Sequence, residues 1–134
     1  MKKLLLIIGS IQILVGLLHF FMPLFFTKSE SFLLLPNIEM NYLLLVTYAV
    51  GILLIAFGAS TILLSKKTKE LGKILYFYMI IQALLWTARV ILELVYPVEL
   101  EMFGIKPFTV IVLPGLVLEW GLILYAMILY RKIP

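Results

Sequence analysis

The amino-acid sequence predicts an all-α integral membrane protein, an antiparallel bundle of four transmembrane helices with both termini in the cytoplasm. Composition is the first observation, because 64% of the 134 residues are hydrophobic and only 13% are charged. A soluble domain has about 45–50% apolar and about 25% charged residues. The other two observations are four long apolar runs and the placement of the basic residues between them. We expect one membrane domain over residues 1–134.

Each apolar run exceeds the roughly 20 residues that a helix needs to cross a hydrocarbon core about 30 Å thick. The four expected spans are Leu4–Phe26, Asn41–Leu64, Leu71–Tyr96 and Pro107–Tyr130. The N-terminus resembles a secretory signal, with Lys2 and Lys3 before an apolar run. That run is longer than a signal core of about 7–15 residues, and no small-x-small cleavage site follows it. We therefore interpret it as a retained first span.

Basic residues gather on one side of the predicted bundle. They are Lys2, Lys3, Lys66, Lys67, Lys69, Lys73, Arg131 and Lys132, whereas the connections on the other side contain only Lys28 and Lys106 as basic residues. The positive-inside rule places both termini and the Ser65–Glu70 turn in the cytoplasm, as in a multi-pass protein of the inner membrane. The net charge of +4 follows from this loop bias. It does not form a clustered basic face, so nucleic acid is not an expected partner.

Two spans carry polar residues at helical spacing. In the first span, Gly9, Gln12, Gly16, His19 and Pro23 follow steps of three and four residues and share one face. In the third span, Tyr78, Gln82, Trp86, Arg89 and Glu93 do the same. A charge near the bilayer centre costs about 2.5–3.5 kcal/mol, so such faces are expected to point into the bundle. Gln12 and Gln82 are expected to be interhelical hydrogen-bond partners, each worth about 0.6 kcal/mol.

The other two spans add small residues and a carboxylate. The second span has a stripe of small residues: Thr47, Gly51 and Gly58. Glycines on the first and second spans would allow two helices to approach closely. In the fourth span, Glu119 follows Gly115 by one turn and lies close to mid-membrane. A carboxylate at that depth cannot reach water along its own helix.

Three arrangements of these charges are open. Arg89 pairs with Glu93 at i+4, and Glu119 is protonated. Alternatively, Glu119 pairs with a protonated His19. In the third arrangement Arg89 forms an ion pair with Glu119, and the Glu93 side chain turns to the membrane–water interface. The first two differ by one proton moved between Glu119 and His19. Two groups that share a proton in this way are the least that proton exchange or acid–base chemistry requires.

The leading functional hypothesis is a polar pocket inside the membrane that opens to the outer leaflet and binds a small or lipid-like ligand with proton exchange. Its expected lining is Gln12, His19, Gln82, Trp86, Arg89, Glu93, Glu119 and Trp120. A second hypothesis is a membrane enzyme that uses Glu119 or His19 as acid–base on a lipid or quinone-like substrate. A third is an accessory or structural subunit that binds a membrane-protein partner or a second copy. Membrane lipid is a partner in all three.

No motif of a recognised enzyme class is present. The chain has no cysteine, which excludes disulfides and thiolate ligands. Its one histidine and the glutamates of the spans show no metal-ligand spacing, so no metal site is expected. No phosphate loop, nucleophile elbow or dinucleotide fingerprint occurs, and no cofactor is expected. Whether the protein is an enzyme stays open at this point.

The chain resembles the DoxX-like group of small four-helix membrane proteins. The resemblance rests on size, four spans, the glycine-bearing first span that ends in His19-Phe20-Phe21-Met22-Pro23, and Arg89 followed by Glu93. It covers most of the chain in outline and includes no diagnostic motif. It implies a fold and a membrane location, with accessory roles in membrane redox systems among the group's members. No residue role is implied by it.

Overall fold

The computed structural model describes residues 1–28, 30–68, 70–96 and 112–131. Over these residues the chain is helical and contains no strand. Four helices are long and apolar enough to cross a membrane: α1 (Lys2–Phe21), α4 (Asn37–Ser65), α5 (Gly72–Val95) and α6 (Leu113–Arg131). The short helices α2 (Pro23–Phe26) and α3 (Glu30–Leu33) connect α1 to α4. The predicted all-α fold with four apolar spans is confirmed over this part of the chain.

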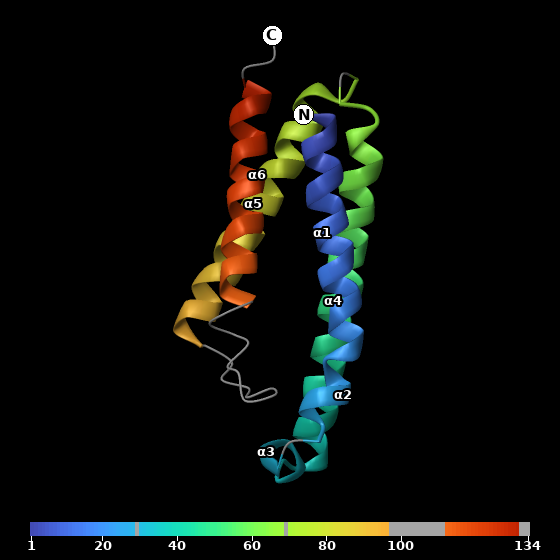
Figure 1. Cartoon of the computed structure of the whole chain (residues 1–134), viewed down its shortest axis with the longest axis vertical. Coiled ribbons are helices and arrows are strands. Elements are labelled where there is room, and N and C mark those ends of the chain that lie inside the picture. Colours follow the sequence, from blue (N-terminus) through green and yellow to red (C-terminus); the bar gives the residue numbers. More distant parts are fainter. Residues whose placement is uncertain (29, 69, 97–111, 132–134) are drawn as a thin grey trace.

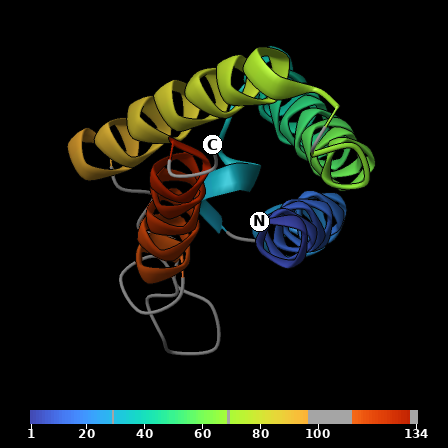
Figure 2. The ribbon, with the colours of Figure 1, turned by 90° about the horizontal axis from the view of Figure 1, so that it is seen from above.

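The four long helices form two pairs. In Figure 1, α1 leads from the N-terminal end to α2 and α3 at the far end, and α4 leads back beside α1. Helix α5 then leaves the α4 end, and α6 packs against it. The start of α1 and the end of α6 lie at the same end of the molecule. Figure 2 shows α5 running obliquely from α4 towards the far side of α6.

The α1–α4 pair is built on glycine. A Cβ atom added to Gly58 would lie 2.6 Å from the backbone oxygen of Gly9. One added to Gly16 would lie 2.8 Å from the backbone oxygen of Gly51. Because glycine has no side chain, the two backbones come into direct contact, as in small-xxx-small packing. The glycines of the predicted stripes on the first and second spans therefore form the seam between α1 and α4.

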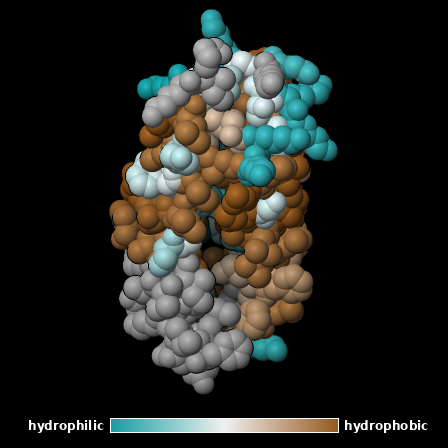
Figure 3. Space-filling view, turned by 45° about the horizontal axis from the view of Figure 1, so that its top comes forward, coloured by the Kyte–Doolittle hydropathy of each residue, from teal (hydrophilic) through white to brown (hydrophobic). Residues whose placement is uncertain are grey.

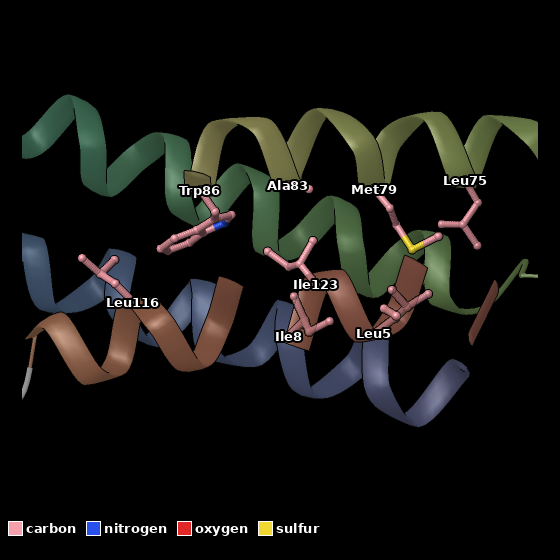
Figure 4. Packing of buried hydrophobic residues seen from close by; sticks show 9 residues of the cluster. Leu5, Ile8, Leu75, Met79, Ala83, Trp86, Leu116 and Ile123 are labelled. Atoms are coloured by element: carbon pink, nitrogen blue, oxygen red, sulfur yellow. The ribbon is translucent and has the colours of Figure 1, made fainter. Parts of the chain in front are cut away.

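Hydrogen bonds from polar side chains of α6 hold it against α5. The Trp120 indole Nε1 donates a hydrogen bond to the Thr87 hydroxyl at 2.9 Å. Nearer the ends of the two helices, the Tyr130 hydroxyl donates to the backbone oxygen of Gly72 at 2.7 Å. An apolar core then fills the space between α1, α5 and α6, as Figure 4 shows. Its members are Leu5, Ile8, Leu75, Met79, Ala83, Trp86, Leu116, Ile123 and Ala126.

The boundaries differ from the prediction mainly at α4. The sequence predicted a second span from residue 41, but α4 begins at Asn37, directly after Pro36. Proline starts helices readily because its missing N–H is not needed in the first turn. With 29 residues, α4 is about 43 Å long at 1.5 Å per residue. That length matches a bilayer of about 40–45 Å with both headgroup layers included. Residues 107–111 of the predicted fourth span lie outside the described residues.

Candidate functional site

A closed ring of side-chain hydrogen bonds joins three helices. Gln12 Nε2 on α1 donates to Gln82 Oε1 on α5 at 2.7 Å. Gln82 Nε2 donates to the Thr61 hydroxyl on α4 at 2.8 Å, and that hydroxyl lies 3.2 Å from Gln12 Oε1. All three side chains are buried. The prediction that Gln12 and Gln82 are interhelical partners is confirmed, and we call these three residues the polar ring.

The polar ring lies near the middle of the membrane span. Gln12 is ten residues from the start of α1, and Gln82 is ten residues from the start of α5. Both are therefore about 15 Å along their helices. Since the hydrocarbon core is about 30 Å thick, this depth is remote from both headgroup layers. Buried polar groups at such depth are held in place by one another rather than by water.

Two hydroxyl groups extend the ring towards the backbone of α4. Tyr78 donates to the Phe57 carbonyl oxygen at 2.9 Å, and its hydroxyl lies 3.0 Å from that of Thr61. The Thr61 hydroxyl lies 2.8 Å from the same carbonyl. Sequence reasoning did not include Thr61 or Tyr78 among the site residues. The available signal was position: Thr61 follows Gly58 by three residues, so it shares the face of α4 that meets α1.

Glu119 on α6 is the ionisable group beside the polar ring. Its side chain is buried, with 2% of the residue exposed, and its carboxyl interacts with the side chain of Gln12. The other carboxyl oxygen, Oε1, has no hydrogen-bond partner among the described residues. A buried polar group without a partner costs about 1–3 kcal/mol. Such a cost at mid-membrane is typical of a functional group rather than a structural one.

Arg89 and Glu93 form a separate ion pair on α5. They lie seven and eleven residues beyond Gln82, about 10 and 16 Å further along the helix. The Arg89 side chain is 45% exposed, whereas that of Glu93 is 4% exposed. The structure has the Arg89–Glu93 pair, which excludes the third charge arrangement. Arg89 is therefore not the cation that serves Glu119.

His19 lies apart from Glu119. Its ring Nδ1 donates to the Val15 carbonyl oxygen of its own helix at 2.8 Å. Its Cβ faces α4, only 3.1 Å from where a Cβ on Gly51 would stand. The described residues contain no ion pair between His19 and Glu119. This geometry does not support an acid–base couple made of these two side chains.

The two tryptophans of the predicted lining have different surroundings. Trp86 is buried in the apolar core, and Figure 4 shows it on the α5 side of the cluster that also holds Leu116. Trp120 is partly buried and hydrogen-bonded to Thr87. The structure thus brings Gln12, Gln82 and Glu119 together and leaves the Arg89–Glu93 pair, His19 and Trp120 in separate contacts.

No group of three or more histidine, cysteine, aspartate or glutamate residues that could hold a metal ion is found in the described ranges. Comparison with known proteins adds no further assignment. No protein-family model, no curated protein and no solved structure matches the chain. The resemblance to DoxX-like proteins therefore stays a prediction.

Proposed function

We propose that the chain is an inner-membrane protein whose bundle binds a small or lipid-like ligand at Glu119, next to the polar ring. The single observation that carries this proposal is the buried Glu119 carboxyl with one oxygen lacking a hydrogen-bond partner among the described residues. A ligand group that bonds this oxygen recovers the free energy that burial costs the carboxyl. An ionised Glu119 accepts a hydrogen bond from the ligand, and a protonated one donates, so binding and proton exchange are coupled at this atom.

Access from the lipid is the second requirement. Figure 3 shows an apolar surface over the middle of the molecule, interrupted by a narrow hollow on that face. A ligand with an apolar body suits such an apolar surface, and its polar group would bond to Glu119. We expect the polar group to be a single hydroxyl, amine or carbonyl, since the polar ring already satisfies most of its own bonds.

The proposed orientation is an antiparallel bundle with both termini in the cytoplasm. Its support is the charge at one end of the molecule, where Figure 3 shows hydrophilic residues gathered. The basic residues there are Lys2 and Lys3, Lys66 and Lys67 of the α4–α5 turn, Lys73, and Arg131. By the positive-inside rule this end faces the cytoplasm. The α2–α3 connection then faces the outer side.

The test compares ligand retention in three versions of the full chain, purified in nanodiscs. They are the natural sequence, Glu119→Gln, and the control Glu39→Gln, which alters an exposed carboxylate in the first turn of α4. Native mass spectrometry and solvent extraction measure any co-purifying molecule. We expect equal retention by the natural chain and the control. For Glu119→Gln we expect about a tenfold loss, equivalent to about 1.4 kcal/mol.

Equal retention by all three versions, or no bound molecule in the natural chain, would contradict ligand binding at Glu119. Melting temperatures of the three versions separate loss of ligand from loss of fold. If Glu119→Gln melts at the temperature of the control but loses the ligand, the carboxyl contacts the ligand.

A second candidate function is that of an accessory subunit, as the DoxX-like resemblance implies. The observation that favours it is Gly121 on α6, which is exposed and has nothing within 4 Å of an added Cβ. Small residues on a lipid-facing helix suit close approach by a partner helix. A stoichiometric partner that co-purifies with the natural chain but not with Gly121→Leu would favour this function over ligand binding.

A further inference from the structure

The Arg131 side chain is fixed on a pair of tyrosine rings at one end of the molecule. Its Nε donates a hydrogen bond to the Tyr76 hydroxyl oxygen at 2.6 Å, and its guanidinium carbon lies 5.5 Å from the centre of the Tyr76 ring. Tyr130 stacks on Tyr76 with 6.0 Å between the ring centres, and its hydroxyl donates to the Gly72 carbonyl oxygen. These contacts join the last turn of α6 to the first turns of α5, so the guanidinium is held over the ring as a cation–π pair.

This end of the molecule is basic, and Arg131 has no counter-ion there among the described residues. The ion pair found in those residues joins Arg89 to Glu93, near the opposite end of α5. Glu70 is the carboxylate that the described part of the chain places at this end, and it is exposed. We call this end the basic end, and its basic residues are Lys2, Lys3, Lys66, Lys67, Lys73 and Arg131. Positive charge is therefore in excess over the described residues of the basic end.

The hydrogen-bond donors around Arg131 match an oxyanion. A guanidinium has five N–H groups, and the Tyr76 hydroxyl oxygen accepts from the one on Nε. The N–H groups on the two terminal nitrogens have no acceptor in the part of the chain that the structure describes. Because the Tyr76 hydroxyl accepts from Arg131, it keeps its own proton to donate. Parallel N–H groups of a guanidinium bind two oxygens of one phosphate group in a bidentate manner.

Arg131 lies at the depth of the phospholipid headgroups. It is the last residue of α6, which has 19 residues and is about 28 Å long. A helix of this length ends close to the surface of a hydrocarbon core about 30 Å thick. Tyrosines such as Tyr76 and Tyr130 are enriched at the same level, where an amphipathic ring meets both acyl chains and headgroups. The phosphate groups of phospholipids are therefore the anions nearest to Arg131.

We propose that Arg131 and Tyr76 bind the phosphate group of one anionic phospholipid at the basic end. The terminal nitrogens of Arg131 donate to the two charged phosphate oxygens, and the Tyr76 hydroxyl donates to one of them as well. A zwitterionic lipid suits the site less well, because the neighbouring lysines repel the ammonium of its headgroup. Fixing the guanidinium in advance lowers the entropy cost of binding. Glu119 lies about 18 Å away along α6, so this site does not depend on ligand binding there.

Native mass spectrometry of the full chain in detergent tests the class of lipid. The titrated lipids are dioleoyl-phosphatidylglycerol, which is anionic, and dioleoyl-phosphatidylcholine, which has the same acyl chains and a zwitterionic headgroup. We expect the chain to bind one phosphatidylglycerol with an apparent dissociation constant about tenfold below that for phosphatidylcholine. Equal dissociation constants for the two lipids would overturn the proposal. An excess of inorganic phosphate should leave the lipid bound, and displacement of the lipid by phosphate would show that a free anion, not a lipid, is the ligand.

Two variants separate a site at Arg131 from the general charge of the basic end. Arg131→Lys keeps the positive charge but loses the parallel N–H groups and the hydrogen bond from Nε. Lys67→Gln, the matched control, removes one exposed charge from the same end and leaves the tyrosine pair intact. We expect the dissociation constant for phosphatidylglycerol to rise about tenfold in Arg131→Lys and less than about twofold in Lys67→Gln. If Arg131→Lys has an effect no larger than that of Lys67→Gln, the lipid follows net charge alone and the site at Arg131 is refuted.

Discussion

Arg89 and Glu93 illustrate how two residues of one ion pair differ in their surroundings. The arginine reaches the surface of the helix bundle, while the glutamate is buried and keeps one oxygen, Oε2, without a partner among the described residues. Their i,i+4 spacing places them side by side on α5. Replacing Arg89 removes little packing, but its positive charge compensates the buried Glu93 carboxylate. The pair therefore matters to stability mainly through Glu93.

A double-substitution experiment tests this asymmetry. Arg89→Gln leaves the Glu93 carboxylate buried without its cation, and we expect the free energy of unfolding to fall by about 1–3 kcal/mol. The double variant Arg89→Gln with Glu93→Gln removes both charges and should recover most of that loss. Lys73→Gln, at the exposed start of α5, is the control. Equilibrium unfolding in one detergent measures all three. A double variant as unstable as Arg89→Gln would contradict the argument.

The hydrogen bonds of the polar ring separate the contacts that helical spacing predicts from those that it does not. Helical spacing placed Gln12 and Gln82 on inward faces, and they do bond to each other. Spacing did not show that Thr61 closes the ring, because a threonine hydroxyl inside a helix can bond to its own backbone instead. The structure has both contacts, to Phe57 and to the ring. His19 was placed on the face of Gln12, yet its ring bonds back to Val15.

At the scale of elements, the glycine seam between α1 and α4 gives a second prediction. Gly58→Ala puts a Cβ atom 2.6 Å from the backbone oxygen of Gly9, so the helices must move apart. We expect the free energy of unfolding to fall by about 1–3 kcal/mol, as in other overpacked cores. Gly121→Ala is the matched control, since an added Cβ there meets nothing within 4 Å. Thermal unfolding in detergent compares the two.

The control should be neutral or more stable, because alanine favours a helix over glycine by about 0.5–1 kcal/mol. If Gly58→Ala and Gly121→Ala lower the free energy of unfolding equally, glycine is needed for reasons other than the seam.

Element boundaries were harder to predict than the seam. Hydropathy alone placed the start of the second span at residue 41, whereas α4 begins at Asn37, directly after Pro36.

At the scale of the whole molecule, orientation in the membrane is open to a direct test. Because the chain has no cysteine, single-cysteine variants report one position each. Asn37→Cys marks the exposed start of α4, and Lys67→Cys marks the exposed turn after it. A membrane-impermeant maleimide added to intact cells should label Asn37→Cys and should label Lys67→Cys only after lysis. The unsubstituted chain is the control. The reverse pattern would invert the proposed orientation.

The overall fold was more predictable than the candidate site. Four apolar runs were enough to predict four spans, since each must satisfy its backbone hydrogen bonds as a helix. Glycine spacing predicted close helix contacts, and α1 meets α4 at these residues. The site depends on how α5 crosses α6 and how far each side chain reaches. Hydropathy contains no information on either, so Glu119 was expected in one pocket lining with Gln12, but their direct interaction was not predicted.

The glycine seam has a consequence for the order in which the protein is made. The backbone contacts of α1 with α4 involve residues 9, 16, 51 and 58, all of which are synthesised before α5 begins. Translation proceeds at about 5–20 residues per second and favours early assembly of the N-terminal part. Helices α1 and α4 can therefore pack together before α5 brings Gln82 to Gln12 and Thr61. Arrival of α5 closes the polar ring, and α6 delivers Glu119 last.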